Sequence, residues 1–241
     1  ASAGTDPRLG ANEAPPAIVS MFLGDELTEI LESIQKGTLY TERSEDTLEI
    51  GAKVLPSFLR DTTDRNRTSP FAFTGNKFEF RMVGSASSIS CPNVVLNTIV
   101  ADTLAGFADE LEKAEDLDKA IRDLLRRTLR EHWRIIFNGN NYAEEWVKEA
   151  ERRGLCNLKT TVDALPFLVT RENIALFERH GVFHSSELTA RHEIYLENYC
   201  KTIHIEALTM IDMVKREILP AAIAYQGVLA DVIAKKSAIS E

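Results

Sequence analysis

Three charged residues at alternating positions, Lys77, Glu79 and Arg81, form the group in this sequence that is best suited to chemistry. Phe78 and Phe80 occupy the positions between them. Successive side chains of a β-strand point to opposite faces, so this pattern predicts a strand with one charged face and one aromatic face. We expect the aromatic face to pack in a core and thereby hold the charged side chains rigidly.

A second strand is expected just before this one. Arg67 precedes Phe71 and Phe73, and the segment 74–76, Thr-Gly-Asn, separates them from the charged strand. Gly and Asn tolerate a positive φ angle, so the segment predicts the turn of a β-hairpin. A sheet with one solvated, salt-bridged face would show the same pattern, and that alternative stays open here.

Phosphoryl transfer is the reaction that these residue types fit best. It needs oxygen ligands for Mg²⁺ or Mn²⁺, together with Arg or Lys side chains that neutralise the charge on the transferred group. Glu79 supplies one carboxylate, and the cations come from Arg67, Lys77 and Arg81. One carboxylate alone is too few for a site that holds two or three metal ions.

Other common kinds of catalytic site have no support in this sequence. The five histidines make no His-Glu-x-x-His pattern, and we expect them to be satisfied or exposed helix residues. There is no Gly-x-Ser-x-Gly segment and no Cys/His pair, which leaves nucleophilic hydrolysis unsupported. The three cysteines are far apart, which predicts free thiols in a reducing compartment.

Composition narrows the class of protein. The 241 residues are 44% hydrophobic and 27% charged, which is typical of a soluble globular protein with one large or two small domains. A net charge of −9 argues against a nucleic-acid binder. By inspection no apolar run approaches the roughly 20 residues that span a bilayer, and no leader is apparent. We therefore expect a cytoplasmic protein that binds no membrane.

Helices dominate the elements that must position the charged group. Residues 1–16 have loop composition, and apolar spacing predicts a helix over residues 17–35. Pro92 is expected to open a helix over 93–114, followed by a second helix that ends at the Asn-Gly-Asn-Asn segment 138–141. From residue 142 onward only helices are expected. A regular apolar stripe from Leu196 to Ile218 predicts packing in a bundle or coiled coil, with a kink or restart at Pro220.

The hairpin residues also carry a family resemblance. Arg67 followed by Lys77-x-Glu79-x-Arg81 resembles the paired strands of the glutamine synthetase active site, and segment 66–81 is similar to the type III branch of that family. The resemblance covers nearly the whole chain. It continues in the loop 8–16 and in segments 93–98, 149–155 and 205–213.

This resemblance implies a fold and an assembly. The implied class is α+β: residues 1–140 would be the C-terminal part of the catalytic domain, with antiparallel strands and long helices. Residues 141–241 would be the type III-specific helical domain, which in the family continues further. The intact protein would form a large ring-shaped homo-oligomer with active sites between neighbouring subunits.

The resemblance also implies a reaction. ATP would phosphorylate the γ-carboxylate of L-glutamate, and ammonia would displace phosphate from γ-glutamyl phosphate to give L-glutamine, a step of nitrogen assimilation. The substrates would be glutamate, ammonium and ATP, with Mg²⁺ or Mn²⁺ as cofactor. The family's other metal ligands lie upstream of this sequence, so we expect the chain alone to be inactive.

Four hairpin residues receive roles from the resemblance. Glu79 stands where the family has a metal ligand that contacts the nucleotide phosphates. Arg81 matches the arginine that holds the reacting γ-carboxylate, and Arg67 matches an arginine on the transferred phosphate. Lys77 would bind the nucleotide together with Arg67, although shorter family members have Arg at that position.

Two residues of the N-terminal loop also match family positions. Arg8 fits the arginine that binds the substrate α-carboxylate. Glu13 fits the flap glutamate, which closes the site over the acyl phosphate and takes a proton from ammonium. The sequence departs from the family at Pro7, where His is expected, and at Ala72, near which an arginine is expected.

Two other functions stay open at this point. A related ligase that couples γ-glutamyl phosphate to another amine would keep Glu79 and Arg81. A helical assembly or regulatory module that has lost catalysis would account for Pro7 and Ala72 instead.

Overall fold

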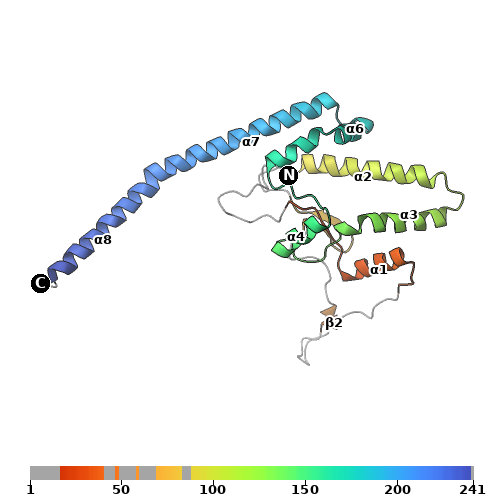
Figure 1. The fold of residues 1–241 in the computed structure, drawn as a ribbon, viewed down its shortest axis with the longest axis horizontal. Helices are drawn as coiled ribbons and strands as arrows, with labels where there is room; N and C mark the ends of the chain where they lie inside the picture. Colours follow the sequence, from red (N-terminus) through yellow and green to blue (C-terminus); the bar gives the residue numbers. More distant parts are fainter. Residues whose placement is uncertain (1–16, 41–46, 49–57, 60–68, 83–87, 240–241) are drawn as a thin grey trace. The chain divides into compact units, whose positions relative to one another are not determined.

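The computed structural model describes residues 17–40, 47–48, 58–59, 69–82 and 88–239. These residues are mostly helical and include one small three-stranded sheet, as the α+β prediction requires in outline. Two compact units are present, Ala1–Thr189 and Ala190–Glu241. The first unit contains every strand among the described residues, together with the described part of the candidate site (Figure 1).

The three-stranded sheet has the order β1 (Met21–Phe22), β4 (Phe71–Phe73), β5 (Phe78–Phe80). Strands β4 and β5 form the predicted antiparallel hairpin, in which Ala72 lies opposite Glu79. Strand β1 pairs with β4 in parallel, which differs from the antiparallel arrangement that we expected. A separate antiparallel pair joins β2 (Thr47–Leu48) to β3 (Phe58–Leu59).

The predicted helix over residues 17–35 begins too early. Gly24 has φ +79°, a backbone conformation that favours glycine, and helix α1 starts after it as Asp25–Lys36. The residues before Gly24 run into the sheet instead, where Ile18 and Leu23 are buried. Their apolar spacing therefore comes from a buried strand and its flanks, because short apolar runs of strands and helices look alike in sequence.

Helices α2 (Ser90–Leu111) and α3 (Leu117–His132) confirm two of the predicted helices and lie side by side (Figure 1). Arg127 joins them through two hydrogen bonds to Glu110, of 3.1 and 2.6 Å. Helix α3 also packs against α1, and its Arg126 Nε donates to the Ile34 carbonyl over 3.2 Å. The same carbonyl also accepts the Gly37 N–H over 3.2 Å, so the end of α1 is held both by its own cap and by α3.

The core next to the sheet is built around Trp146 of α4 (Glu144–Arg152). Its ring stacks on Phe137 with 3.8 Å between centroids, and Ile18 and Ala150 complete the cluster. Phe137 follows α3 and the short 3-10 helix η1 (Trp133–Ile135). The core therefore joins the sheet to the segment that leads into the C-terminal helices.

Short helices follow, as predicted for the region after residue 142. They are α5 (Thr161–Ala164), the 3-10 helix η2 (Leu165–Val169) and α6 (Arg171–Arg179). His180, just after α6, lies 2.9 Å from Asp102 of α2, so this histidine is a satisfied helix-end residue as expected. The three cysteines are free and exposed.

The last element is one long helix made of α7 (Ser185–Met213), the π-helical turn η3 (Val214–Ile218) and α8 (Leu219–Ile239). The π turn precedes Pro220, which lacks an N–H and whose ring clashes with the carbonyl four residues earlier in a regular α-helix. Figure 1 shows a bend there, so the predicted effect of Pro220 is a bend and not a restart.

Many large apolar side chains of this long helix are exposed, including Ile203, Met210 and Ile218 of the predicted stripe, whereas Leu196 is half-buried. The packing of this stripe in a bundle or coiled coil stays a prediction. By length and composition alone, the helix Ser185–Ile239 is apolar enough to cross a membrane. The expectation that no apolar run approaches this length is therefore wrong, since residues 218–234 contain a single charged side chain, Asp231. An interior helix of a large soluble protein meets the same criterion.

Candidate functional site

The turn between β4 and β5 fixes the start of the charged strand. The Thr74 N–H donates to the Lys77 carbonyl over 2.8 Å, and Gly75 adopts φ +94°. This conformation is strained for residues with a Cβ, which explains glycine at this position. The hairpin prediction is therefore confirmed.

The aromatic face of the hairpin is a ladder of rings. Phe71 stacks on Phe78 with 5.5 Å between centroids, and Phe73 lies 5.3 Å from Phe78. Phe78 is nevertheless 45% exposed. The other three phenylalanines, Phe71, Phe73 and Phe80, are half-buried, so the packing of this face in a core stays a prediction. The rings stabilise the hairpin through cross-strand contacts, which do not require full burial.

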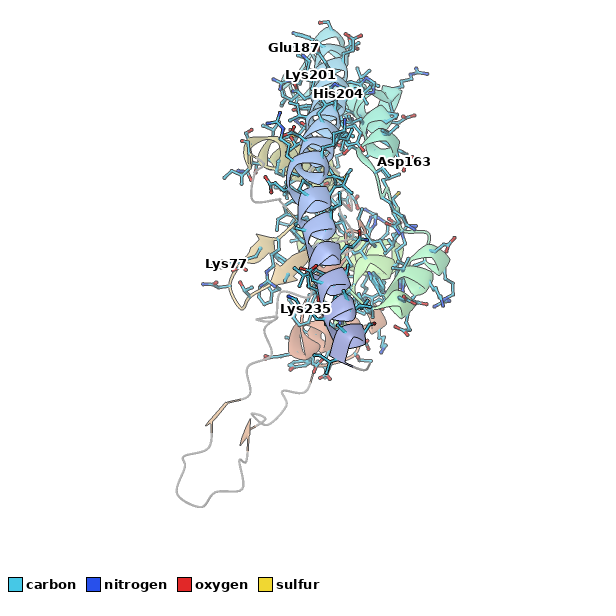
Figure 2. The ribbon with its side chains drawn as sticks, turned by 90° about the vertical axis from the view of Figure 1, so that its left-hand side faces the viewer. Lys77, Asp163, Glu187, Lys201, His204 and Lys235 are labelled. Atoms are coloured by element: carbon cyan, nitrogen blue, oxygen red, sulfur yellow. The ribbon has the colours of Figure 1, made fainter. Side chains whose placement is uncertain are left out.

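Burial varies along the charged face. Ala72 lies directly opposite Glu79, so the two side chains share a face, and Ala72 is completely buried. The Arg81 side chain is only 15% exposed, whereas the Lys77 side chain is 65% exposed. Figure 2 shows Lys77 at the outer edge of the hairpin. Arg81 is therefore the more buried of the two cations, and Lys77 is the more exposed.

Glu79 bridges the two cations. Its Oε1 lies 3.3 Å from Lys77 Nζ, and its Oε2 accepts hydrogen bonds from Arg81 Nη2 and Nε over 3.0 and 3.2 Å. The hydrogen bonds from Arg81, and then from Lys77, lower the pKa of Glu79. A carboxylate kept ionised is the form that binds a metal ion.

The structure thus brings together three of the six predicted site residues. Arg8, Glu13 and Arg67 lie outside the described residues. Within the described ranges no group of three or more His, Cys, Asp and Glu side chains could hold a metal ion. Glu79 therefore offers one ligand, and a complete divalent-metal site needs oxygen donors from beyond these ranges.

Two asparagines form hydrogen bonds with residues next to the ends of strands β1 and β4. Asn138 Oδ1 accepts from the Leu23 and Gly24 N–H groups over 3.0 and 3.1 Å. Asn141 is buried and bonds to Ser20 and Ser69, which flank β1 and β4. We interpreted segment 138–141 only as a helix stop, because an Asn-Gly cluster predicts a turn whether or not its side chains are buried.

Comparisons with known proteins point to one family. The "Glutamine synthetase C-terminal domain" model matches residues 120–237. The chain is 44% identical to "Glutamine synthetase" from Butyrivibrio fibrisolvens over 98% of the chain and 34% of the relative. It is 42% identical to "Type-3 glutamine synthetase" from Dictyostelium discoideum, over 95% of the chain and 32% of the relative.

A third relative is "Glutamine synthetase" from Bacteroides fragilis, with 38% identity over 99% of the chain and 34% of the relative. The chain spans about a third of the length of these curated relatives. All three matches include the charged hairpin, because each covers at least 95% of the chain.

Proposed function

Because this chain belongs to the glutamine synthetase family, we propose that the longer protein containing it ligates ammonia to L-glutamate at the expense of ATP, through γ-glutamyl phosphate. The product is L-glutamine, which serves nitrogen assimilation. The observation that carries this proposal is the charged hairpin: an ionised Glu79 held between Lys77 and Arg81 on one face. Those groups suit the handling of phosphate and metal charge.

Each described site residue has a proposed task that fits its surroundings. Glu79 gives an oxygen ligand to Mg²⁺ or Mn²⁺, which when bound offsets the charge of the ATP phosphates. Arg81 is well buried and already donates two N–H groups in one plane, a geometry that suits the γ-carboxylate of glutamate. Lys77 is exposed and can turn from Glu79 towards a nucleotide phosphate.

The remaining site residues are proposed from the family resemblance alone. Arg67 binds the transferred phosphate, Arg8 binds the α-carboxylate of glutamate, and Glu13 closes the site and accepts a proton from ammonium. Glu13 has a specific test in the longer protein. Glu13→Ala should leave ATP binding intact and impair the use of ammonium, and unchanged ammonium kinetics would refute the assignment.

We also propose the domain division and the assembly. Residues 1–140 belong to the catalytic domain and residues 141–241 to the helical domain of the type III branch. The whole protein is a cytoplasmic ring-shaped homo-oligomer that binds neither nucleic acid nor membrane. The apolar stripe of α7 and α8 supports assembly, since large exposed apolar surfaces mark interaction sites.

The experiment is ATP- and Mg²⁺-dependent formation of γ-glutamyl hydroxamate from glutamate and hydroxylamine. It is run on this chain and on a version extended upstream to the length of the relatives. We expect activity in the extended protein only, because the hairpin supplies part of the site. A folded, assembled extended protein without activity would favour a helical assembly or regulatory module.

Competition between amines distinguishes a glutamine synthetase from the remaining alternative, a γ-glutamyl-amine ligase. In the extended protein, ammonium should be the preferred acceptor of the γ-glutamyl group. A clear preference for another primary amine, measured as product at equal amine concentrations, would instead identify a γ-glutamyl-amine ligase. That enzyme would use the same Glu79 and Arg81.

A further inference from the structure

A buried polar network contacts the chain just before β4, the first strand of the charged hairpin. Ser20 Oγ donates to Asn141 Oδ1 over 2.6 Å, and Asn141 Nδ2 donates to Ser69 Oγ over 3.1 Å. All three residues are about 1% exposed. Buried polar groups cost stability unless they are paired, and the asparagine amide pairs with both serines through one acceptor and one donor.

This network connects to the backbone of Arg81. Ser69 is followed by Pro70, whose carbonyl accepts the Arg81 N–H over 2.8 Å. Pro70 is itself fully buried, and Arg81 holds Glu79 through its side chain. Asn141 is thus linked to the base of the hairpin through Ser69 and Pro70.

The asparagine is held by its own rigid surroundings. Asn138, three residues earlier, accepts hydrogen bonds from the Leu23 and Gly24 N–H groups. The ring of Phe137 stacks on the ring of Trp146. Gly139 lies so close to the Phe137 ring that a Cβ there would be 2.5 Å from Phe137 Cζ. The segment 137–141 is therefore a fixed support and not an adaptable loop.

We propose that Asn141 is a positioning residue for the ligase reaction, acting through Ser69 and Pro70 to fix Arg81. This inference rests on the proposed function. Asn141 lies within the part of the chain that matches the family's C-terminal domain, so that segment helps to shape the hairpin site. A shift of about 1 Å in a substrate-positioning group lowers turnover by up to about a hundredfold.

A matched pair of variants tests this role in the extended protein. Ser69→Ala removes the bond from Asn141 to the hairpin, and Ser20→Ala removes the bond on the other side of the same amide. Both serines are equally buried, so both variants should lower Tm. We expect Ser69→Ala to lower kcat for hydroxamate formation about tenfold or more with little change in KM for ATP, and Ser20→Ala to stay within about twofold.

Asn141→Leu provides a second variant of similar size, which removes the amide and with it the hydrogen bond to Ser69. Its kcat should fall like that of Ser69→Ala, and the double variant should fall no further, because both changes break one link. Amide hydrogen exchange at Arg81 gives a readout that does not depend on activity. It should be faster in Ser69→Ala than in Ser20→Ala.

The outcomes distinguish the two proposals. An inactive wild-type extended protein would overturn the proposed function and this inference with it. An active wild type whose Ser69→Ala and Ser20→Ala variants lose kcat equally, or not at all, would overturn the positioning role alone. Equal exchange rates at Arg81 in the two variants would do the same.

Discussion

At the scale of residues, the site depends on a carboxylate that two cations share. Arg81 and Lys77 lower the pKa of Glu79, so its carboxylate stays ionised to a lower pH than an ordinary glutamate, and its 38% exposed side chain still faces solvent. A metal ion would replace Lys77 more easily than Arg81, because Lys77 makes one 3.3 Å contact whereas Arg81 makes two hydrogen bonds. The alternation of charges in the sequence predicted this grouping of three side chains.

A second shared carboxylate provides a test of stability against pH. Glu149 of α4 accepts from Arg152 over 2.8 Å and from Arg153 over 2.6 Å, and these hydrogen bonds lower its pKa from 4.5 to about 2. Because the pKa of Glu149 is lower in the folded chain, its ionisation stabilises the fold at pH values above the ordinary pKa of 4.5. That contribution is lost as the pH falls from 4.5 towards 2.

We therefore expect Glu149→Gln to lower Tm at neutral pH, and the Tm difference from wild type to shrink as the pH falls from 4.5 to 2. Thermal unfolding followed by circular dichroism measures this difference. Glu151→Gln, on the same helix, is the control and should show a smaller difference at neutral pH. A Tm difference for Glu149→Gln that stays constant down to pH 2 would contradict the ion-pair assignment.

At the scale of elements, the sequence predicted the hairpin and the helices α2 and α3 because their patterns are long and regular. It placed α1 too early, because nothing in the apolar spacing shows that Gly24 has a positive φ. It did not predict how burial varies along each face of the hairpin, where Arg81 is 15% and Phe78 45% exposed. Alternation shows that two faces differ, but the burial of each residue also depends on contacts with residues far away in sequence, as between Ser69 and Asn141.

The support behind the sheet gives a prediction at this scale. Gly139→Ala should destabilise the protein by about 1–3 kcal/mol, because its Cβ would overlap the Phe137 ring that stacks on Trp146. Gly106→Ala in α2 is the matched control. Its Cβ would meet nothing within 4 Å, and alanine in a helix should stabilise by about 0.5–1 kcal/mol.

Denaturant unfolding of both variants measures these differences in the free energy of unfolding. Equal effects of the two substitutions would show that the Phe137 ring moves aside freely. The segment 137–141 would then not be the fixed support described above.

At the scale of the whole molecule, the notable feature is the long C-terminal helix, which exposes many large apolar side chains. Its α8 part is apolar around its circumference, as in helices buried by other protein or by lipid. Asp231 lies inside α8 and would be costly in hydrocarbon, which favours burial by protein. Sequence alone predicted the apolar stripe but not its neighbours, because a stripe does not specify what covers it.

We therefore expect the extended protein to form an oligomer and to leave lipid vesicles unbound. Light scattering behind size-exclusion chromatography should give a mass of several protomers. In flotation with phosphatidylcholine–phosphatidylglycerol vesicles, the protein should stay in the lower fractions. Flotation of the protein with the vesicles would contradict the proposed assembly and support a membrane role for α8.

The central claim is that the charged hairpin is part of a glutamine synthetase site, and Glu79 tests it most directly. The measurement is kcat for γ-glutamyl hydroxamate formation by the extended protein carrying Glu79→Gln. Glu110→Gln is the matched control, because Glu110 is also paired with an arginine, Arg127, which lowers its pKa, but it lies on α2. We expect Glu79→Gln to remove most of the activity and Glu110→Gln to retain it. Near-normal turnover of Glu79→Gln would contradict the account.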